Sequence, residues 1–169
     1  MSGFYQNGYK DSLWVTFHEN GNKKREGKYD LDVRIGIWQH WYNNGQAKKS
    51  VNYNNGERVI TYNSRAGDQM VLEGNGDWVA YSLDKKIQSN GSYKNGKRHG
   101  VWKTFYDNGQ IASIENYVEN ENDGVWKYYK EDGKLSQVKS YALGVKQGLW
   151  EDYHNLSLIH ISEPTRPSQ

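Results

Sequence analysis

Aromatic and polar residues alternate along this chain in short stretches that recur at a fixed interval. Tryptophan stands at positions 14, 38, 78, 102, 126 and 150, and most of these neighbours are 24 residues apart. Tyr62 lies 24 residues after Trp38, so the single gap of 40 residues contains a shortened unit. The alternation around each tryptophan, as in residues 101–106, is typical of a β-strand. The pattern therefore predicts about six strand-based repeats.

Three further columns keep step with the tryptophans. In most units an aromatic residue stands three positions after the tryptophan, a tyrosine stands fifteen positions after it, and a glycine stands two positions before it. The members are Phe17, Trp41, Tyr81, Phe105, Tyr129 and Tyr153, then Tyr29, Tyr53, Tyr93, Tyr117 and Tyr141, then Gly36, Gly76, Gly100, Gly124 and Gly148. Columns that hold over about 140 residues indicate one structural unit repeated in register.

Asparagine–glycine and aspartate–glycine pairs mark two sets of turns. Pairs at 20–21, 44–45, 108–109 and 132–133 lie inside the units, and pairs at 7–8, 55–56 and 95–96 lie between them. The first set predicts two-residue type I′ turns. A two-residue turn at 108–109 would pair Gly100 with Tyr117, Trp102 with Glu115 and Tyr106 with Ile111. Gly100 would then leave room for the Tyr117 ring.

These elements predict an all-β repeat protein, an elongated antiparallel meander or solenoid of 24-residue hairpins. We expect residues 1–155 to form a single array, with an irregular unit at 56–75 where Tyr62 replaces tryptophan and residues 65–68 replace the usual turn. A bulge, kink or loose hairpin is expected there.

The pattern stops after Asn155. Both prolines follow it, and residues 156–166 resemble the translation of a sequencing adapter. We therefore interpret 156–169 as a non-native, disordered tail. Because Asn7-Gly8 resembles a turn between units, we also expect the array to be truncated at its start, where a signal peptide or a lipid anchor could have been lost.

Composition narrows the possible functions. Hydrophobic residues make up 35% of the chain, below the usual share of about 45–50%, but aromatic residues reach 14%. The net charge of +2 is too balanced for a nucleic-acid partner. There is no cysteine, and no apolar stretch reaches the roughly 20 residues of a membrane helix. The compartment stays open, with the cytoplasm favoured, and the oligomeric state also stays open.

Candidate catalytic or metal-binding groups do not form a recognisable set. The histidines at 18, 40, 99, 154 and 160 show no ligand spacing. The acidic stretch 119–124 resembles a calcium loop, but Lys130 stands where the closing acid would fall. We therefore expect a protein that is not an enzyme and that holds no cofactor or metal.

The unit seen at residues 95–110, with Asn-Gly-Lys, Gly-x-Trp, paired aromatics and Asn-Gly, resembles the MORN-repeat-variant family. In bacteria this family is associated with antitoxins of the YwqK type. The resemblance covers residues 7–154 and implies an interaction scaffold. The antitoxin type further implies a partner protein, a toxin.

Three functions remain open: a protein-interaction module, a ligand-binding repeat whose rings would cage choline or stack on glycan, and a peripheral membrane module using rings and lysines. Tyrosine and tryptophan suit interfaces because they combine large contact area with a polar tip. The candidate interaction surface comprises Trp38, Trp41, Tyr42, Trp102, Phe105, Tyr106, Trp126 and Tyr129.

Overall fold

The computed structural model describes residues 2–82, 84–154 and 157–162. Within these ranges the regular structure consists of β-strands, and no helix occurs. The strands are β1 (Ser2–Gln6), β2 (Tyr9–Phe17), β3 (Lys23–Asp30), β4 (Val33–Trp41), β5 (Ala47–Asn52), β6 (Arg58–Asn63), β7 (Gln69–Val71), β8 (Gly76–Tyr81), β9 (Ile87–Lys94), β10 (Lys97–Phe105), β11 (Ile111–Val118), β12 (Glu121–Asn122), β13 (Gly124–Tyr129), β14 (Leu135–Ala142), β15 (Val145–His154) and β16 (Ser157–Ser162). The predicted all-β class is confirmed.

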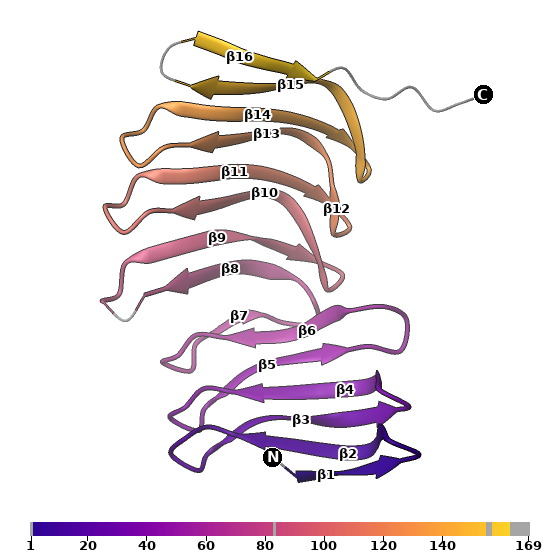
Figure 1. The fold of residues 1–169 in the computed structure, drawn as a ribbon. Helices are drawn as coiled ribbons and strands as arrows, with labels where there is room; N and C mark the ends of the chain where they lie inside the picture. The colour runs from indigo at the N-terminus through magenta and orange to yellow at the C-terminus, as the bar shows by residue number, and fades with distance from the viewer. Residues whose placement is uncertain (1, 83, 155–156, 163–169) are drawn as a thin grey trace, which may run out of the picture. The chain divides into compact units, whose positions relative to one another are not determined.

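The strands form two sheets, and within each sheet most strands that follow one another in sequence are hydrogen-bonded neighbours (Figure 1). One sheet runs from β1 to β7, and the other runs from β8 to β16, with short β12 paired to β11 beside the main path. This is the antiparallel meander that the hairpin repeat predicts. The chain divides into two compact units, which we call the first unit (residues 1–78 and 93–97) and the second unit (residues 79–92 and 98–169).

The turns inside the repeats differ from the predicted type. The Tyr106 N–H donates to the Gln110 carbonyl at 2.8 Å, and the Gly109 N–H donates to the Tyr106 carbonyl at 2.8 Å. Gly109 has a φ of 85°, whereas Asn108 does not have a positive φ. This is a three-residue loop, a type I turn followed by a glycine bulge. Accordingly, Ile111 pairs with Phe105, and its predicted pairing with Tyr106 is wrong.

The type I′ turns lie instead at the other ends of the strands. Asn7 and Gly8 have φ values of 50° and 86°, and Asn95 and Gly96 have 52° and 78°. Leu31 and Asp32 adopt the same conformation without glycine, at 45° and 68°. The meander therefore alternates between two kinds of turn, both of which select asparagine or glycine for positive φ or local side-chain bonds.

The glycine two positions before most of the repeat tryptophans is explained by its backbone conformation. Gly36 and Gly100 have φ values of 64° and 71°, and a Cβ at either position would meet no atom within 4 Å. At Gly36 the β3–β4 register shifts, which marks a β-bulge. The prediction that Gly100 leaves room for Tyr117 is therefore wrong, although the pairings of Gly100 with Tyr117 and of Trp102 with Glu115 are confirmed.

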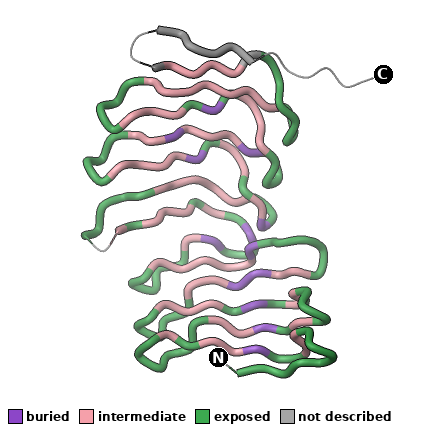
Figure 2. Tube along the Cα trace, viewed as in Figure 1, coloured by how far each residue is buried: buried purple, intermediate pink, exposed green. Residues whose placement is uncertain are grey.

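The irregular stretch at 56–75 and the strand before it hold the most buried aliphatic residues of the first unit. Val51 and Val71 are fully buried, Val59 packs against them, and Tyr62 and Trp78 cover the cluster. Elsewhere in both units the buried positions are isolated points on successive strands (Figure 2). The core is thus a row of side chains along one face of each sheet.

Residues 157–162, which we expected to belong to a disordered tail, form β16 and pair with β15. β16 pairs with the edge of β15, which would otherwise present unpaired backbone groups, and the isoleucines of the sequence Leu-Ile-His-Ile favour a strand. Residues 155–156 and 163–169 lie outside the described residues, and the origin of the segment stays a prediction.

Candidate interaction surface

Three of the predicted surface residues belong to the core. Trp38, Trp102 and Trp126 are 2%, 5% and 7% exposed. The indole N–H of Trp38 donates to the Lys28 carbonyl at 3.1 Å, and that of Trp126 donates to the Asn116 carbonyl at 2.9 Å. Both faces of each strand carry apolar residues, so alternation alone did not reveal which aromatic column would be covered.

The buried tryptophans alternate with tyrosines in a continuous row within each unit. In the first unit, Tyr29 and Tyr53 meet Trp38 edge-on, with ring centroids 4.9 Å and 6.4 Å away. The Arg34 guanidinium lies 5.1 Å from the Trp38 ring and donates to the Tyr53 hydroxyl at 3.1 Å. Such edge-on and cation–π contacts stabilise aromatic rows beyond area burial alone.

A glycine eleven positions before some tryptophans lets the indole lie flat on the neighbouring strand. A Cβ on Gly27 would lie 2.2 Å from the Trp38 ring, and a Cβ on Gly91 would lie 2.2 Å from the Trp102 ring. The position equivalent to these glycines is Glu115 for Trp126. Trp126 is tilted by 57° and 52° against its tyrosine neighbours, whereas Trp38 meets its own at 81° and 79°.

The other five predicted residues are half-buried: Trp41, Tyr42, Phe105, Tyr106 and Tyr129. Two of them link neighbouring hairpins. The Tyr42 hydroxyl donates to the Asn63 carbonyl at 3.0 Å, and the Tyr106 hydroxyl donates to the Tyr129 carbonyl at 2.7 Å. These tyrosines therefore stabilise the array and leave only part of each ring accessible.

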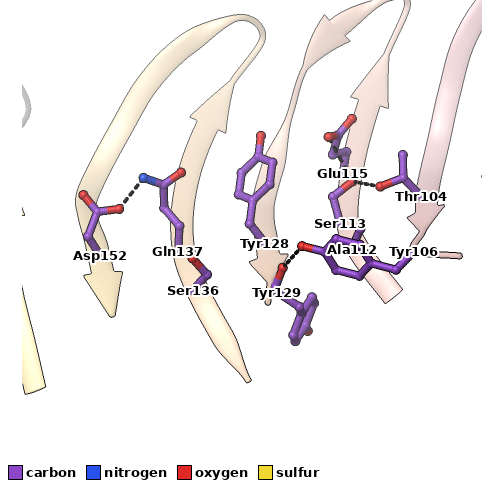
Figure 3. A pocket seen from close by; sticks show the side chains of 10 residues that line it. All are labelled: Thr104, Tyr106, Ala112, Ser113, Glu115, Tyr128, Tyr129, Ser136, Gln137 and Asp152. Carbon is purple, nitrogen blue, oxygen red and sulfur yellow. Dashed lines mark hydrogen bonds between the residues drawn. The ribbon is translucent and has the colours of Figure 1, made fainter. Parts of the chain in front are cut away.

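A shallow pocket of about 560 Å³ lies on the tryptophan face of the second unit (Figure 3). We call it the polar trough. It contains two predicted residues, Tyr106 and Tyr129, together with residues that sequence reasoning missed. Its lining is Thr104, Tyr106, Ala112, Ser113, Glu115, Tyr128, Tyr129, Ser136, Gln137 and Asp152.

The middle of the polar trough is a row of directly paired residues on neighbouring strands. Ser113 pairs with Tyr128, Tyr128 with Gln137, and Gln137 with Asp152. The row follows the 24-residue spacing, because Tyr128 and Asp152 each stand two positions after a repeat tryptophan. The residue types at these positions differ from unit to unit. The repeat period therefore predicts the strands, but it does not identify these residues as a site.

Two carboxylates flank the polar trough. The Glu115 carboxylate accepts hydrogen bonds from the Ser113 hydroxyl at 3.1 Å and the Tyr117 hydroxyl at 2.8 Å, and Asp152 accepts from the Gln137 amide. Burial raises the pKa of Tyr128 to about 12, and the charge of Glu115 adds to this effect. No lysine or arginine is among the ten lining residues. The trough is therefore an anionic, hydroxyl-rich surface.

The positions that correspond to Ser113, Tyr128 and Gln137 hold basic residues in the first unit. Arg25, His40 and Lys49 are directly paired across β3, β4 and β5. Burial, followed by the charges of Lys49 and Arg25, lowers the pKa of His40 to about 4. Its Nε2 atom is buried without a hydrogen-bond partner in the described part of the chain. We call these three residues the cationic row.

The face opposite the tryptophans exposes aliphatic residues. Leu13 and Ile37 in the first unit and Val101 and Val125 in the second are about half exposed. In the second unit Lys103 and Lys127 pair directly with Ile114 on β11, one on each side. We call this surface the outer face. It presents apolar residues beside lysines on a hydrogen-bonded sheet.

Among the described residues, no group of three histidine, aspartate or glutamate side chains is arranged to hold a metal ion. The same part of the chain contains no helix that is long and apolar enough to cross a membrane.

The fold and its surfaces define a β-hairpin repeat protein with an open sheet. The model of the MORN repeat variant family matches residues 10–30, 34–55, 98–119 and 122–142, which together make up about half of the chain. The chain therefore belongs to the MORN repeat variant family, whose repeats generally serve protein or membrane interaction. Each match covers one hairpin closed by a three-residue loop, such as β2–β3 or β10–β11. No curated protein matches the chain.

Proposed function

We propose that this chain is a non-enzymatic protein-binding module whose outer face is the contact surface. The observation that carries the proposal is that half-exposed Val101 and Val125 each stand two positions before a lysine on the same strand, Lys103 on β10 and Lys127 on β13, on one face of the second unit. Burial of aliphatic side chains against a partner lowers the free energy, because apolar surface is removed from water. The lysines beside them favour a partner with carboxylates around an apolar centre.

The rigidity of the sheet supports this assignment. The tryptophan row, the tyrosine links and the backbone pairing stabilise the scaffold without using the outer face. A preorganised surface loses little conformational entropy on association, so a modest apolar area suffices for binding.

The finer form of the proposal concerns the partner. The resemblance to YwqK-type antitoxins suggests a toxin, encoded beside this chain. The test is co-expression of the neighbouring open reading frame with this chain in a bacterial host, with growth as the readout. Rescue of growth by this chain supports the toxin form, and a harmless neighbouring product rejects it.

The wider proposal is tested by pull-down from the native host with two matched variants. Val101→Glu with Val125→Glu places charges on the outer face, and Leu143→Glu places one at an exposed turn. Glutamate is tolerated at the turn, because the equivalent Glu119 has a φ of 52°. A partner that binds the wild type and L143E but not the double variant supports the proposal, and equal capture by all three overturns it.

The alternative functions are tested by other measurements. Sedimentation with anionic vesicles that Lys103→Gln and Lys127→Gln abolish would indicate membrane association through the same lysines. Binding of choline or glycan fragments in calorimetry would indicate a ligand-binding repeat. These outcomes distinguish the three functions left open by the sequence.

A further inference from the structure

The polar trough has a charge that its own lining does not neutralise. Glu115 on β11 and Asp152 on β15 both line it, and in the described part of the chain neither carboxylate forms an ion pair with lysine or arginine. Their hydrogen-bond donors are neutral hydroxyl and amide groups from Ser113, Tyr117 and Gln137. A cationic ligand would supply the missing counter-charge.

The Tyr128 ring lies between the two carboxylates. Tyr128 stands beside Ser113 on one side and Gln137 on the other, so its ring is in the middle of the row (Figure 3). A planar guanidinium stacks on such a ring and at the same time bonds a carboxylate with two parallel N–H groups. An ammonium forms the cation–π contact but lacks the planar stack and the paired bonds.

The spacing of the strands that carry the carboxylates fits two cationic side chains. Glu115 stands on the same strand as Ser113, and Ser113 and Asp152 are three strand spacings apart through Tyr128 and Gln137, so the two strands are about 14 Å apart. An extended peptide covers that distance in about four residues. One arginine at Glu115 and a second at Asp152 are therefore possible on a single segment that crosses the strands.

We propose that the polar trough binds a basic peptide segment, with one arginine side chain against Glu115 and Tyr128 and a second cation at Asp152. This assignment rests on the proposed protein-binding function but uses the face opposite the outer face. The cationic row of Arg25, His40 and Lys49 occupies the equivalent columns of the first unit. The acidic character therefore belongs to the second unit and not to the repeat in general.

Lys139 gives an internal test of this inference. Its Nζ lies 5.0 Å from the centroid of the Tyr128 ring and 5.0 Å from that of Trp150, although it does not line the trough. This lysine competes with an incoming cation for the ring and repels it. Its removal should therefore strengthen binding, whereas removal of either carboxylate should weaken it.

The experiment is isothermal titration calorimetry of the full chain with a tri-arginine peptide at low salt, with tri-lysine, tri-glutamate and maltotriose as comparison ligands. We expect tri-arginine to bind several-fold more tightly than tri-lysine, and its affinity to fall steeply with added salt. The Glu115→Gln, Asp152→Asn double variant should lose at least about tenfold in affinity, and Lys139→Gln should gain a few-fold.

Folding controls keep the result interpretable. Glutamine and asparagine keep oxygen acceptors for the Ser113, Tyr117 and Gln137 donors, and the melting temperature of each variant verifies the fold. Unchanged tri-arginine affinity in the double variant overturns the inference. Maltotriose binding that is insensitive to salt also overturns it, in favour of a glycan site. Failure here leaves the outer-face pull-down unaffected, so the two proposals can fail separately.

Discussion

The hairpins of Trp38 and Trp126 use the same residue in the same column and end with different surfaces. Trp38 lies on Gly27 and meets its tyrosine neighbours nearly at right angles, at 81° and 79°. Trp126, with Glu115 in place of the glycine, is tilted to 57° and 52°. Trp102, which lies on Gly91 in the second unit, meets its tyrosine at 80°. The residue under the ring, and not the unit, decides the geometry.

This difference separates two tasks of one repeat. Where glycine lies under the indole, the ring covers the backbone and the hairpin is closed by packing. Where Glu115 takes that place, its carboxylate stays on the tryptophan face and borders the polar trough. Replacement of the glycine under the indole by glutamate thus turns a surface covered by the ring into a polar one, while the backbone register is retained.

The largest effect should come from removing the flat tryptophan. Trp38→Ala should lower the free energy of unfolding by about 3–5 kcal/mol, because it leaves a cavity where the ring is 2% exposed. Trp126→Ala should lower the free energy of unfolding by less, because the Trp126 ring is tilted and does not lie flat on a glycine. Urea denaturation followed by circular dichroism measures both, with Phe17→Ala, at 44% exposure, as the surface control. Equal losses for Trp38 and Trp126 would contradict the comparison.

Filling the space under the ring should have the next largest effect. Gly27→Ala places a methyl group 2.2 Å from the Trp38 ring and should destabilise the first unit by about 1–3 kcal/mol. Gly91→Ala should cost a similar amount, because Trp102 is packed in the same way. Thermal melts of both variants test this. A neutral result for Gly91 would show that the packing rule does not extend to the second unit.

The cationic row should make the stability of the first unit depend on pH. The pKa of His40 is about 4, below its usual value of 6.5. As pH falls from 6.5 towards 4, the unfolded state binds a proton that the folded state excludes, so stability decreases. The loss should be roughly 1–2 kcal/mol, less than the full shift implies because the ring is partly exposed.

Replacing the histidine isolates this contribution. The His40→Asn variant should lose less stability than the wild type between pH 6.5 and 4 in urea titrations. Identical pH profiles for the two proteins would rule out His40 as the source.

The smallest effect concerns the turns, which are alike in both units. The Asn20 amide donates to the Asn43 carbonyl at 2.6 Å, and the Asn108 amide donates to the Glu131 carbonyl at 3.0 Å. Replacement of either asparagine by aspartate removes the donor but keeps the acceptor within its own turn. Each variant should lose about 1 kcal/mol in thermal denaturation. A loss in only one unit would show that the links between turns are not equivalent.

Much of the backbone could be predicted because its signals are local. The tryptophan period gave the hairpins, and the pairing of Gly100 with Tyr117 followed from it. The turn at Asn108-Gly109 was misassigned, because asparagine–glycine suits both the two-residue turn and the three-residue loop. The distinction depends on one bulged pair, Phe105 with Ile111, which carries no signature of its own.

The candidate site was harder to predict for a different reason. Tryptophan and tyrosine suit both burial and binding, so Trp38, Trp102 and Trp126 could be assigned to a surface while they form the core. The polar trough depends on residues such as Tyr128 and Asp152, whose columns hold different residue types in each unit. A search for repeated residues finds the scaffold and passes over the positions where units differ.

The tyrosine and asparagine links also limit how the gene for such a chain can change in length. Tyr106 reaches Tyr129, and Asn108 reaches Glu131, each 23 positions ahead. Excision or duplication of a complete 24-residue segment gives every hairpin a neighbour with a carbonyl at the required place. A change of another length requires the following hairpin to place its carbonyl anew, as in the irregular unit, where Tyr42 reaches Asn63 only 21 positions ahead. Changes of one whole hairpin keep these links without such adjustment, and they would interrupt the polar trough, which spans several hairpins.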